Sequence, residues 1–236
     1  MIAAVDSRIP ASARHALEAH GFEVILMPPH PALPQGVASH PDLLFFISEE
    51  TVYTTRSYFE IAEAELKKIA FSSHRDLQIC GTEIGKTYPY DILLDAAPIG
   101  NRLLCHPKHT AIELLTCYGE NVIPVRQGYA KCACVPITDH ALITADRSIQ
   151  KAAEREGIEV LLIGEGSISL EGYSTGFIGG ASSYCPDGTV SEIYFCGRLS
   201  SHPDGQAIAA FCSRHGKTAV SLGEFPLTDV GTIFLL

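Results

Sequence analysis

Carboxylates beside predicted strands are the residues of this 236-residue chain most suited to ligand binding. Asp6, Asp91, Glu171 and Asp229 each stand next to an apolar segment typical of a strand. Carboxylates that converge on one cavity bind a cationic or polyhydroxylated small molecule, so we predict these four as ligand-binding residues. The alternative is structural, because acidic side chains beside turns also cap helices and close loops.

Two basic residues and one thiol complete the set of candidates. Cys132 is a candidate nucleophile, since a nearby cation would lower the pKa of its thiol; the alternative is a small buried core residue. Lys131 directly precedes it, so on a strand the two side chains would point to opposite faces and would not form a nucleophile pair. Arg8 and Lys131 would meet an anionic ligand, or else form ordinary ion pairs.

Other motifs do not predict a metal or a cofactor. The chain has eight cysteines but no Cys-x-x-Cys, and Cys132 and Cys134 on one strand face would chelate zinc poorly. Gly164–Gly166 follows a predicted strand, but no helix follows it to hold a pyrophosphate. His-Pro-Asp occurs at 40–42 and 202–204, where proline and aspartate favour a turn or helix start, with catalysis by a histidine as the alternative. We therefore expect no metal and no cofactor.

Composition excludes several classes of partner. With 27 acidic against 17 basic residues the net charge is −10, which argues against nucleic-acid binding. A hydrophobic fraction of 46% with 19% charged residues is typical of a folded globular chain. No apolar run is long enough to span a bilayer, and the N-terminus lacks a signal-peptide pattern. We expect a cytoplasmic location, no membrane partner and free buried thiols.

The elements that must position these residues recur as five copies of one pattern. Each copy has an amphipathic helix, a turn, a short strand, a loop and two further strands, and most of the helices end at a glycine. The predicted helices cover residues 11–20, 58–70, 110–118, 148–156 and 206–215. Strands predicted beside candidate site residues cover 91–94, 131–135 and 175–179.

The last copy lacks its final strand, and Ile2–Val5 would supply it. Such closure protects the sheet edges, as in propellers. We therefore predict an α/β fold: a pseudo-symmetric αβ propeller of five units, forming a single domain over 1–236 and closed by the N-terminal strand. The alternative is a doubly wound parallel sheet, but that fold would alternate one strand with one helix.

Three segments, 128–143, 175–183 and 229–236, carry a resemblance to a known fold. Together with the repeat they resemble the pentein fold of guanidino-group-modifying enzymes: arginine deiminases, dimethylarginine hydrolases and amidinotransferases. The resemblance implies a nucleophilic cysteine near the C-terminus, a histidine that shuttles protons, and carboxylates that hold a guanidinium. Here no cysteine follows Cys212, and Tyr129–Lys131 stands where the histidine would fall.

The resemblance and its departures together lead to one expectation and two alternatives. We expect a member of a bacterial branch of this fold that binds a small polar ligand, of the guanidino class, in a central funnel without the standard cysteine and histidine. One alternative is a hydrolase or transferase for a guanidino compound with relocated catalytic residues, Cys132 among them. The other is a non-catalytic scaffold or interaction protein. The oligomeric state stays open.

Overall fold

A computed structural model describes all residues 1–236, with seven α-helices and fifteen strands in five small sheets. The strands are β1 (Ile2–Asp6), β2 (Glu23–Met27), β3 (Phe45–Ile47), β4 (Thr51–Thr54), β5 (Asp76–Ile79), β6 (Ala97–Ile99), β7 (Arg102–Cys105), β8 (Val122–Pro124), β9 (Cys134–Thr138), β10 (Ala141–Thr144), β11 (Glu159–Leu162), β12 (Ser183–Tyr184), β13 (Glu192–Phe195), β14 (Thr218–Ser221) and β15 (Ile233–Leu235). The helices are α1 (Ala11–Ala19), α2 (Pro41–Leu44), α3 (Arg56–Ile61), α4 (Glu63–Ser72), α5 (Ile112–Tyr118), α6 (Arg147–Arg155) and α7 (Gly205–Arg214). None of the helices combines the length and apolar character needed to cross a bilayer.

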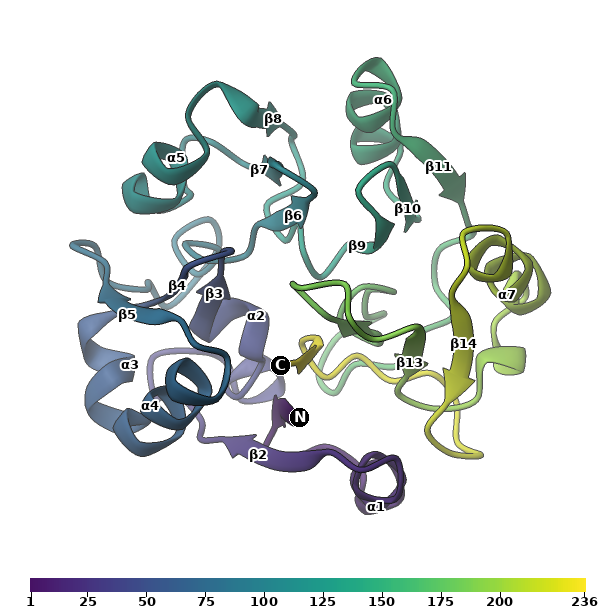
Figure 1. Ribbon diagram of the computed structural model, residues 1–236, viewed down its shortest axis with the longest axis horizontal. Coiled ribbons are helices and arrows are strands. Elements are labelled where there is room, and N and C mark those ends of the chain that lie inside the picture. Colours follow the sequence, from purple (N-terminus) through teal and green to yellow (C-terminus); the bar gives the residue numbers. More distant parts are fainter.

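Three of the sheets share one construction. In the sheets β3-β4-β5, β6-β7-β8 and β9-β10-β11, the first two strands pair antiparallel and the third pairs parallel to the second. A parallel pair needs a long crossover, which a helix supplies in each case. Figure 1 shows the sheets around the middle of the molecule, with the longer helices toward the outside.

The two ends of the chain lie in the same four-stranded sheet, ordered β12-β15-β1-β2. Strand β15 pairs antiparallel with β1, with Ala3 opposite Leu235 and Ala4 opposite Phe234. Both ends therefore lie close together near the middle of the molecule (Figure 1).

Local signals account well for helix α6. Its cap Asp146 accepts hydrogen bonds from the backbone amides of Ser148 and Ile149, which satisfies donors that the first turn leaves free. Ile149 and Ala153 lie on its buried face and anchor it in the core. After the helix, Gly157 adopts φ 73°, the left-handed conformation that ends a helix without a side-chain clash.

Three predicted strands are wrong in whole or in part. Residues 91–94, 131–133 and 175–179 form turns or irregular segments, and the strands lie further along the chain as β6, β9 and β12. The Asp95 carboxylate accepts hydrogen bonds from the amides of Lys131 and Cys132. These two amides therefore do not donate to a neighbouring strand, as a β-strand at this position would require. The predicted helix 58–70 is likewise two helices, α3 and α4, which meet at Ala62.

Candidate functional site

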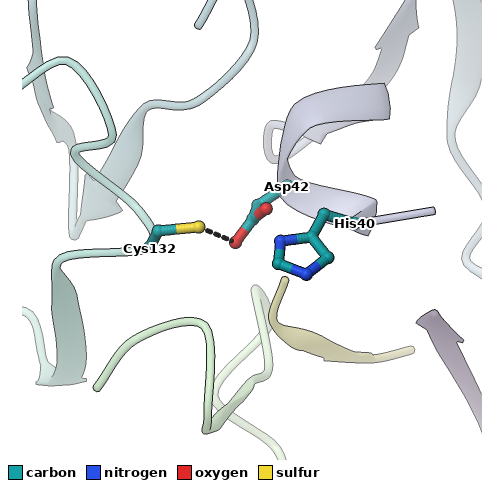
Figure 2. Close-up of side chains that lie close together, drawn as sticks. All are labelled: His40, Asp42 and Cys132. Carbon is teal, nitrogen blue, oxygen red and sulfur yellow. Dashed lines mark hydrogen bonds between the residues drawn. The ribbon is translucent and has the colours of Figure 1, made fainter. Parts of the chain in front are cut away.

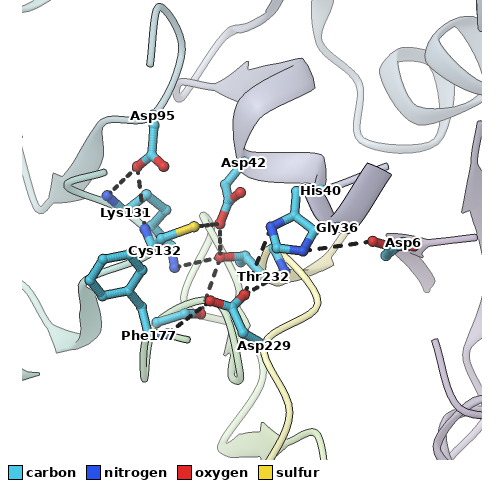
Figure 3. Close-up of polar contacts among 12 residues, drawn as sticks. Asp6, Gly36, His40, Asp42, Asp95, Lys131, Cys132, Phe177, Asp229 and Thr232 are labelled. Atoms are coloured by element: carbon cyan, nitrogen blue, oxygen red, sulfur yellow. Dashed lines mark hydrogen bonds and ion pairs between the residues drawn. The ribbon is translucent and has the colours of Figure 1, made fainter. Parts of the chain in front are cut away.

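A cluster of buried polar side chains fills the middle of the molecule, and we call it the hub (Figures 2 and 3). All its members are between 0% and 4% exposed. They come from the end of β1, the start of α2, the loop before β6, the turn before β9 and the segment before β15. The hub consists of Asp6, His40, Asp42, Asp95, Lys131, Cys132, Asp229 and Thr232.

Asp42 lies at the centre of the hydrogen bonds in the hub. Its Oδ2 accepts a bond from the thiol of Cys132 at 2.8 Å and one from the hydroxyl of Thr232 at 2.8 Å. The ammonium of Lys131 donates in turn to Thr232 Oγ1 at 3.1 Å. Thr232 has φ 69°, which is rare for a β-branched residue, so its surroundings must hold it in place.

Lys131 and Cys132 both point into the hub, which corrects the prediction that they would face opposite sides of a strand. The alternation of side chains holds only for extended backbone, and these residues form a turn. Asp95 Oδ1 fixes that turn by accepting from the Lys131 amide at 2.6 Å and the Cys132 amide at 3.3 Å. The turn therefore presents an ammonium and a thiol side by side.

His40 lies between two carboxylates (Figure 3). Its Nε2 is 3.8 Å from Asp6 Oδ2, and its Nδ1 is 3.8 Å from Asp229 Oδ1, both longer than a hydrogen bond. Asp229 itself is held by the backbone amides of Phe177 and Gly231, at 2.8 and 3.0 Å. The imidazole is thus enclosed by charge without a direct hydrogen-bond partner at Nε2.

The first His-Pro-Asp motif is the sequence signal for this part of the hub. Proline keeps His40 extended and starts α2, which places Asp42 in the first helical turn with both side chains pointing inward. The second motif is separate from the hub: the amide of Asp204 donates to His202 Nδ1, and its carboxylate accepts from the Gly164 amide. A structural role accounts for the second motif, whereas the first contributes two hub residues.

Burial shifts the protonation of the hub strongly. It raises the pKa of Asp42, raises that of Asp95 well above its ordinary value, and raises that of Asp229 to about 7. Burial and the nearby Arg8 lower the pKa of His40 to about 3. For Cys132, burial and the carboxylates around it hold the thiol pKa well above its usual range. The thiol is therefore protonated at neutral pH, which does not favour a nucleophilic role.

The structure brings together four of the seven residues predicted as site residues: Asp6, Lys131, Cys132 and Asp229. A fifth, Arg8, adjoins the hub through its ion pair with Asp6 and donates to the carbonyls of residues 35 and 36.

Two predicted ligand-binding residues lie outside the hub. Asp91 is buried and accepts a hydrogen bond from the Tyr129 hydroxyl at 2.8 Å, while Glu171 is exposed on a loop. Sequence reasoning missed Asp95 and Thr232 and interpreted His40 and Asp42 as structural. For Thr232 the signal was its place in the segment 229–236, which resembles the nucleophile-bearing end of the pentein enzymes.

A cavity of about 840 Å³ opens on the face formed by the hairpin turns. Its lining includes four acidic residues and a single basic one: Glu49, Glu50, Asp139, Asp187 and Lys217. Tyr184 lines both this cavity and a narrow space of about 10 Å³ that reaches Asp42 and Lys131. The Lys131 ammonium lies 5.5 Å from the centre of the Tyr184 ring. Ile47 and Pro98 line both spaces as well, so these two residues and Tyr184 separate the open cavity from the hub.

Comparisons with known proteins connect this arrangement to one family and one fold. The model of a family of unknown function (DUF6873) matches residues 4–234. Among proteins of curated function, none shows significant sequence similarity to the chain.

Solved structures match over most of the chain at low identity. A dimethylarginine dimethylaminohydrolase adduct has a TM-score of 0.54 and 10% identity over 93% of this chain and 90% of its own. The enzyme from Pseudomonas aeruginosa, a mutant in complex with citrulline, has a TM-score of 0.55 and 10% identity over 91% and 81%. SxtG, an amidinotransferase of saxitoxin biosynthesis from Microseira wollei, has 0.52 and 12% over 88% and 72%. At these identities the likeness is one of fold, a mixed α/β fold shared with guanidino-group-modifying enzymes.

Proposed function

The chain belongs to the DUF6873 family, and on this premise we propose that it binds a small cationic ligand of the guanidino class at the hub. One observation carries the proposal: the hub holds four buried carboxylates, Asp6, Asp42, Asp95 and Asp229, against the single buried ammonium of Lys131. Arg8 at the edge pairs with Asp6 and leaves the other three carboxylates in excess. Burial raises the pKa of Asp42, Asp95 and Asp229 because it penalises their negative charge, and a bound cation would favour the ionised carboxylates.

Free acceptor oxygens support a guanidinium in particular. Asp42 Oδ1 and Asp95 Oδ2 are buried and have no hydrogen-bond partner. A guanidinium is planar, carries several N–H donors and pairs with carboxylates through parallel hydrogen bonds. Each such bond would satisfy a buried oxygen that otherwise costs free energy. The same class of compound occurs in the names of the enzymes that share the fold.

We infer that the ligand enters from the acidic cavity on the hairpin-turn face. Glu49, Glu50 and Asp139 attract a cation there, whereas Asp187 is paired with Arg75. The Tyr184 ring lies between this cavity and Asp42. Entry to the hub requires the Tyr184 ring and the Lys131 ammonium to move aside. Because that ammonium repels a cationic ligand, it should weaken binding in the natural protein.

We also propose that the ligand binds without the cysteine and histidine catalysis of the guanidino-group-modifying enzymes. The thiol of Cys132 has a raised pKa, and burial lowers the pKa of His40 to about 3, so neither group suits proton transfer at neutral pH. We also infer that residues 1–236 form one domain, a five-unit αβ propeller. The pairing of β15 with β1 and the position of the five sheets around the hub support this inference.

A thermal-shift screen against arginine, agmatine, methylated arginines, citrulline and unrelated anions tests the proposal. A ligand that binds only the folded chain raises its melting temperature, so the guanidino compounds should raise it and the anions should not. A rise with anions alone would contradict the proposal and point to Arg8 and Lys131 as binding residues. No rise with any compound would favour the scaffold alternative.

Three variants locate the binding site by calorimetry with the best guanidino compound. Asp42→Asn removes one carboxylate and should weaken binding by about tenfold to a hundredfold, the value of a hydrogen bond to a charged group. Lys131→Ala removes the competing cation and should strengthen binding. Asp76→Asn is the matched control, because Asp76 is exposed at the start of β5 and should leave affinity unchanged. Equal affinities in all three variants would place the ligand elsewhere.

A further inference from the structure

We propose that His40, Asp42 and Cys132 form a site for a divalent metal ion of the zinc class. One nitrogen, one carboxylate oxygen and one sulfur of these residues lie within 4.8 Å of one another, and all three residues are buried. Figure 2 shows the three side chains converging, with the Asp42 carboxylate between the thiol and the imidazole. Three protein ligands with a further position for water or another group are the usual set of a non-structural zinc site.

The spacing of the donors is close to that of a metal complex. Zinc binds nitrogen and oxygen at about 2.0–2.2 Å and sulfur at about 2.3 Å, so tetrahedral donors lie roughly 3.5 Å apart. The Cys132 sulfur and Asp42 Oδ2 are 2.8 Å apart, and binding would replace their hydrogen bond by two bonds to the metal. The donor atoms lie within 4.8 Å of one another, so movements of about 1 Å would bring them to this spacing.

Buried atoms without a partner are the second, independent observation. Asp42 Oδ1 is buried and makes no hydrogen bond, so it is free to bind a metal while Oδ2 keeps its bond from Thr232; His40 Nε2, on the far side of the imidazole, has no partner either. Such groups are uncommon in folded proteins because an unsatisfied buried polar atom destabilises the fold. A metal bound to His40 Nδ1 would leave the imidazole proton on Nε2, which lies 3.8 Å from Asp6 Oδ2. A metal-bound histidine whose other nitrogen faces a carboxylate is the common arrangement around zinc.

The donor types select the metal. Sulfur and imidazole nitrogen favour zinc and related transition metals, whereas magnesium and calcium prefer oxygen ligands alone. Binding displaces the proton of Cys132, so the thiolate and Asp42 together balance the two charges of the ion. Asp229, whose Oδ1 is 3.8 Å from His40 Nδ1, offers a carboxylate close to the fourth position. Lys131 opposes the ion, since its ammonium donates to the Thr232 hydroxyl beside the site.

The three ligands do not form a metal-binding sequence motif, which is why the sequence predicted no metal. His40 and Asp42 are two residues apart, and Cys132 follows 90 residues after Asp42. The metal site shares Asp42 with the proposed guanidino site, but it differs in its other donors, because a guanidinium uses only oxygen acceptors while the metal needs the sulfur and the imidazole. Binding of one is measured without the other: metal in the absence of guanidino compounds, and guanidino compounds in the presence of a chelator.

Titration of the chelator-treated, full-length protein with Co²⁺ tests the site. We expect one equivalent to bind and to produce the near-ultraviolet absorption of a cobalt–thiolate bond, and Zn²⁺ should displace it because zinc binds such sites more tightly. Cys132→Ala should abolish the absorption. The matched control is Cys134→Ala: this cysteine is also buried, but its thiol donates to the Ala130 carbonyl and faces no metal donor.

Two further variants keep the test decisive if Cys132→Ala does not fold. His40→Gln removes a ligand and should weaken Co²⁺ binding by more than Asp6→Asn, which changes only the carboxylate behind the imidazole and should cost about tenfold to a hundredfold. A folded wild-type protein that gives no cobalt–thiolate absorption would overturn the proposal. Absorption that persists in Cys132→Ala, or affinity unchanged in His40→Gln, would overturn it as well.

Discussion

Replacement of Lys131 by methionine tests whether the hub carboxylates depend on its charge. Lys131 is 1% exposed, and its ammonium is the one buried cation of the hub. Methionine keeps an unbranched apolar side chain of similar length, which can still pack against Tyr184, so the change removes mainly the charge and one hydrogen bond. The expected result is a less stable but folded protein.

The size of the loss follows from the contacts of Lys131. Removal of one partner from a buried charged group costs about 3–5 kcal/mol. We expect the lower end, about 3 kcal/mol, because the ammonium donates to the Thr232 hydroxyl and not directly to a carboxylate, and because the carboxyls can take up protons. A loss of this size lowers the equilibrium constant for folding more than a hundredfold.

The free energy of unfolding that Lys131→Met loses should increase with pH. Asp229 has a pKa of about 7 in the folded protein, raised by burial from an unfolded value near 4. Between these values the folded state binds more protons than the unfolded state, so stability falls as the pH rises through this window. Without the ammonium, which lowers the pKa of Asp42, Asp95 and Asp229, their pKa values rise further. Lys131→Met should therefore be close to wild type at pH 5 and weakest at pH 8.

Urea denaturation at pH 5, 6.5 and 8 measures the free energy of unfolding. Lys68→Met is the control, because Lys68 is exposed and its pair with Glu23 should contribute less than about 1 kcal/mol at every pH. A Lys131→Met protein that matches wild type at pH 8, or that loses the same free energy at pH 5 and pH 8, would refute the electrostatic account of the hub.

Three further predictions concern the helix cap, the packing around the hub and its thiol. Asp146→Ala should cost about 1 kcal/mol at pH 7 by loss of the α6 cap. Although burial opposes it, hydrogen bonds to its carboxylate lower the pKa of Asp146, so this contribution is present above the unfolded pKa and is lost as the pH falls through the lowered value. In urea denaturation, the absence of a loss at pH 7, or a loss that does not shrink at low pH, would contradict this prediction. Gly179→Ala should lower the free energy of unfolding by about 3 kcal/mol in urea denaturation, because an added Cβ would lie 2.2–2.6 Å from three backbone carbonyl oxygens. Gly164→Ala is the control: its added Cβ would lie 3.4 Å from the nearest atom, so the loss should be less than about 1 kcal/mol. Iodoacetamide should modify Cys132 at least about a hundredfold more slowly than the exposed Cys117 at pH 7.5, as followed by mass spectrometry; comparable rates would restore Cys132 as a reactive nucleophile.

Short-range patterns were enough to predict most of the helices. The predicted helix 148–156 is α6 at Arg147–Arg155, and the predicted helix 206–215 is α7 at Gly205–Arg214. Glycines mark their ends, since Gly157 and Gly216 adopt positive φ. A helix, its cap and its apolar face depend on residues three or four positions apart, which a sequence displays directly.

Residue types also pointed to part of the hub. Asp6, Lys131 and Asp229 were identified as charged residues beside predicted apolar strands, and the structure buries all three in the middle of the molecule. Their charge and their place at predicted strands made them candidates, but nothing in the sequence showed which of the predicted carboxylates would meet. Asp91 and Glu171 had the same local pattern, and the fold places them elsewhere.

Tertiary contacts decided the rest, because they join residues far apart in the chain. The Asp95 carboxylate holds the Lys131 amide across 36 residues and the Asp229 carboxylate holds the Phe177 amide across 52, so the segments 131–133 and 175–179 bend where their apolar character predicts strands. The hydrogen bond from Thr232 to Asp42 spans 190 residues. The sequence by itself determined most of the longer helices, their glycine ends and the presence of residues able to do chemistry. Which of those residues share a site was decided only by contacts between segments far apart in the chain.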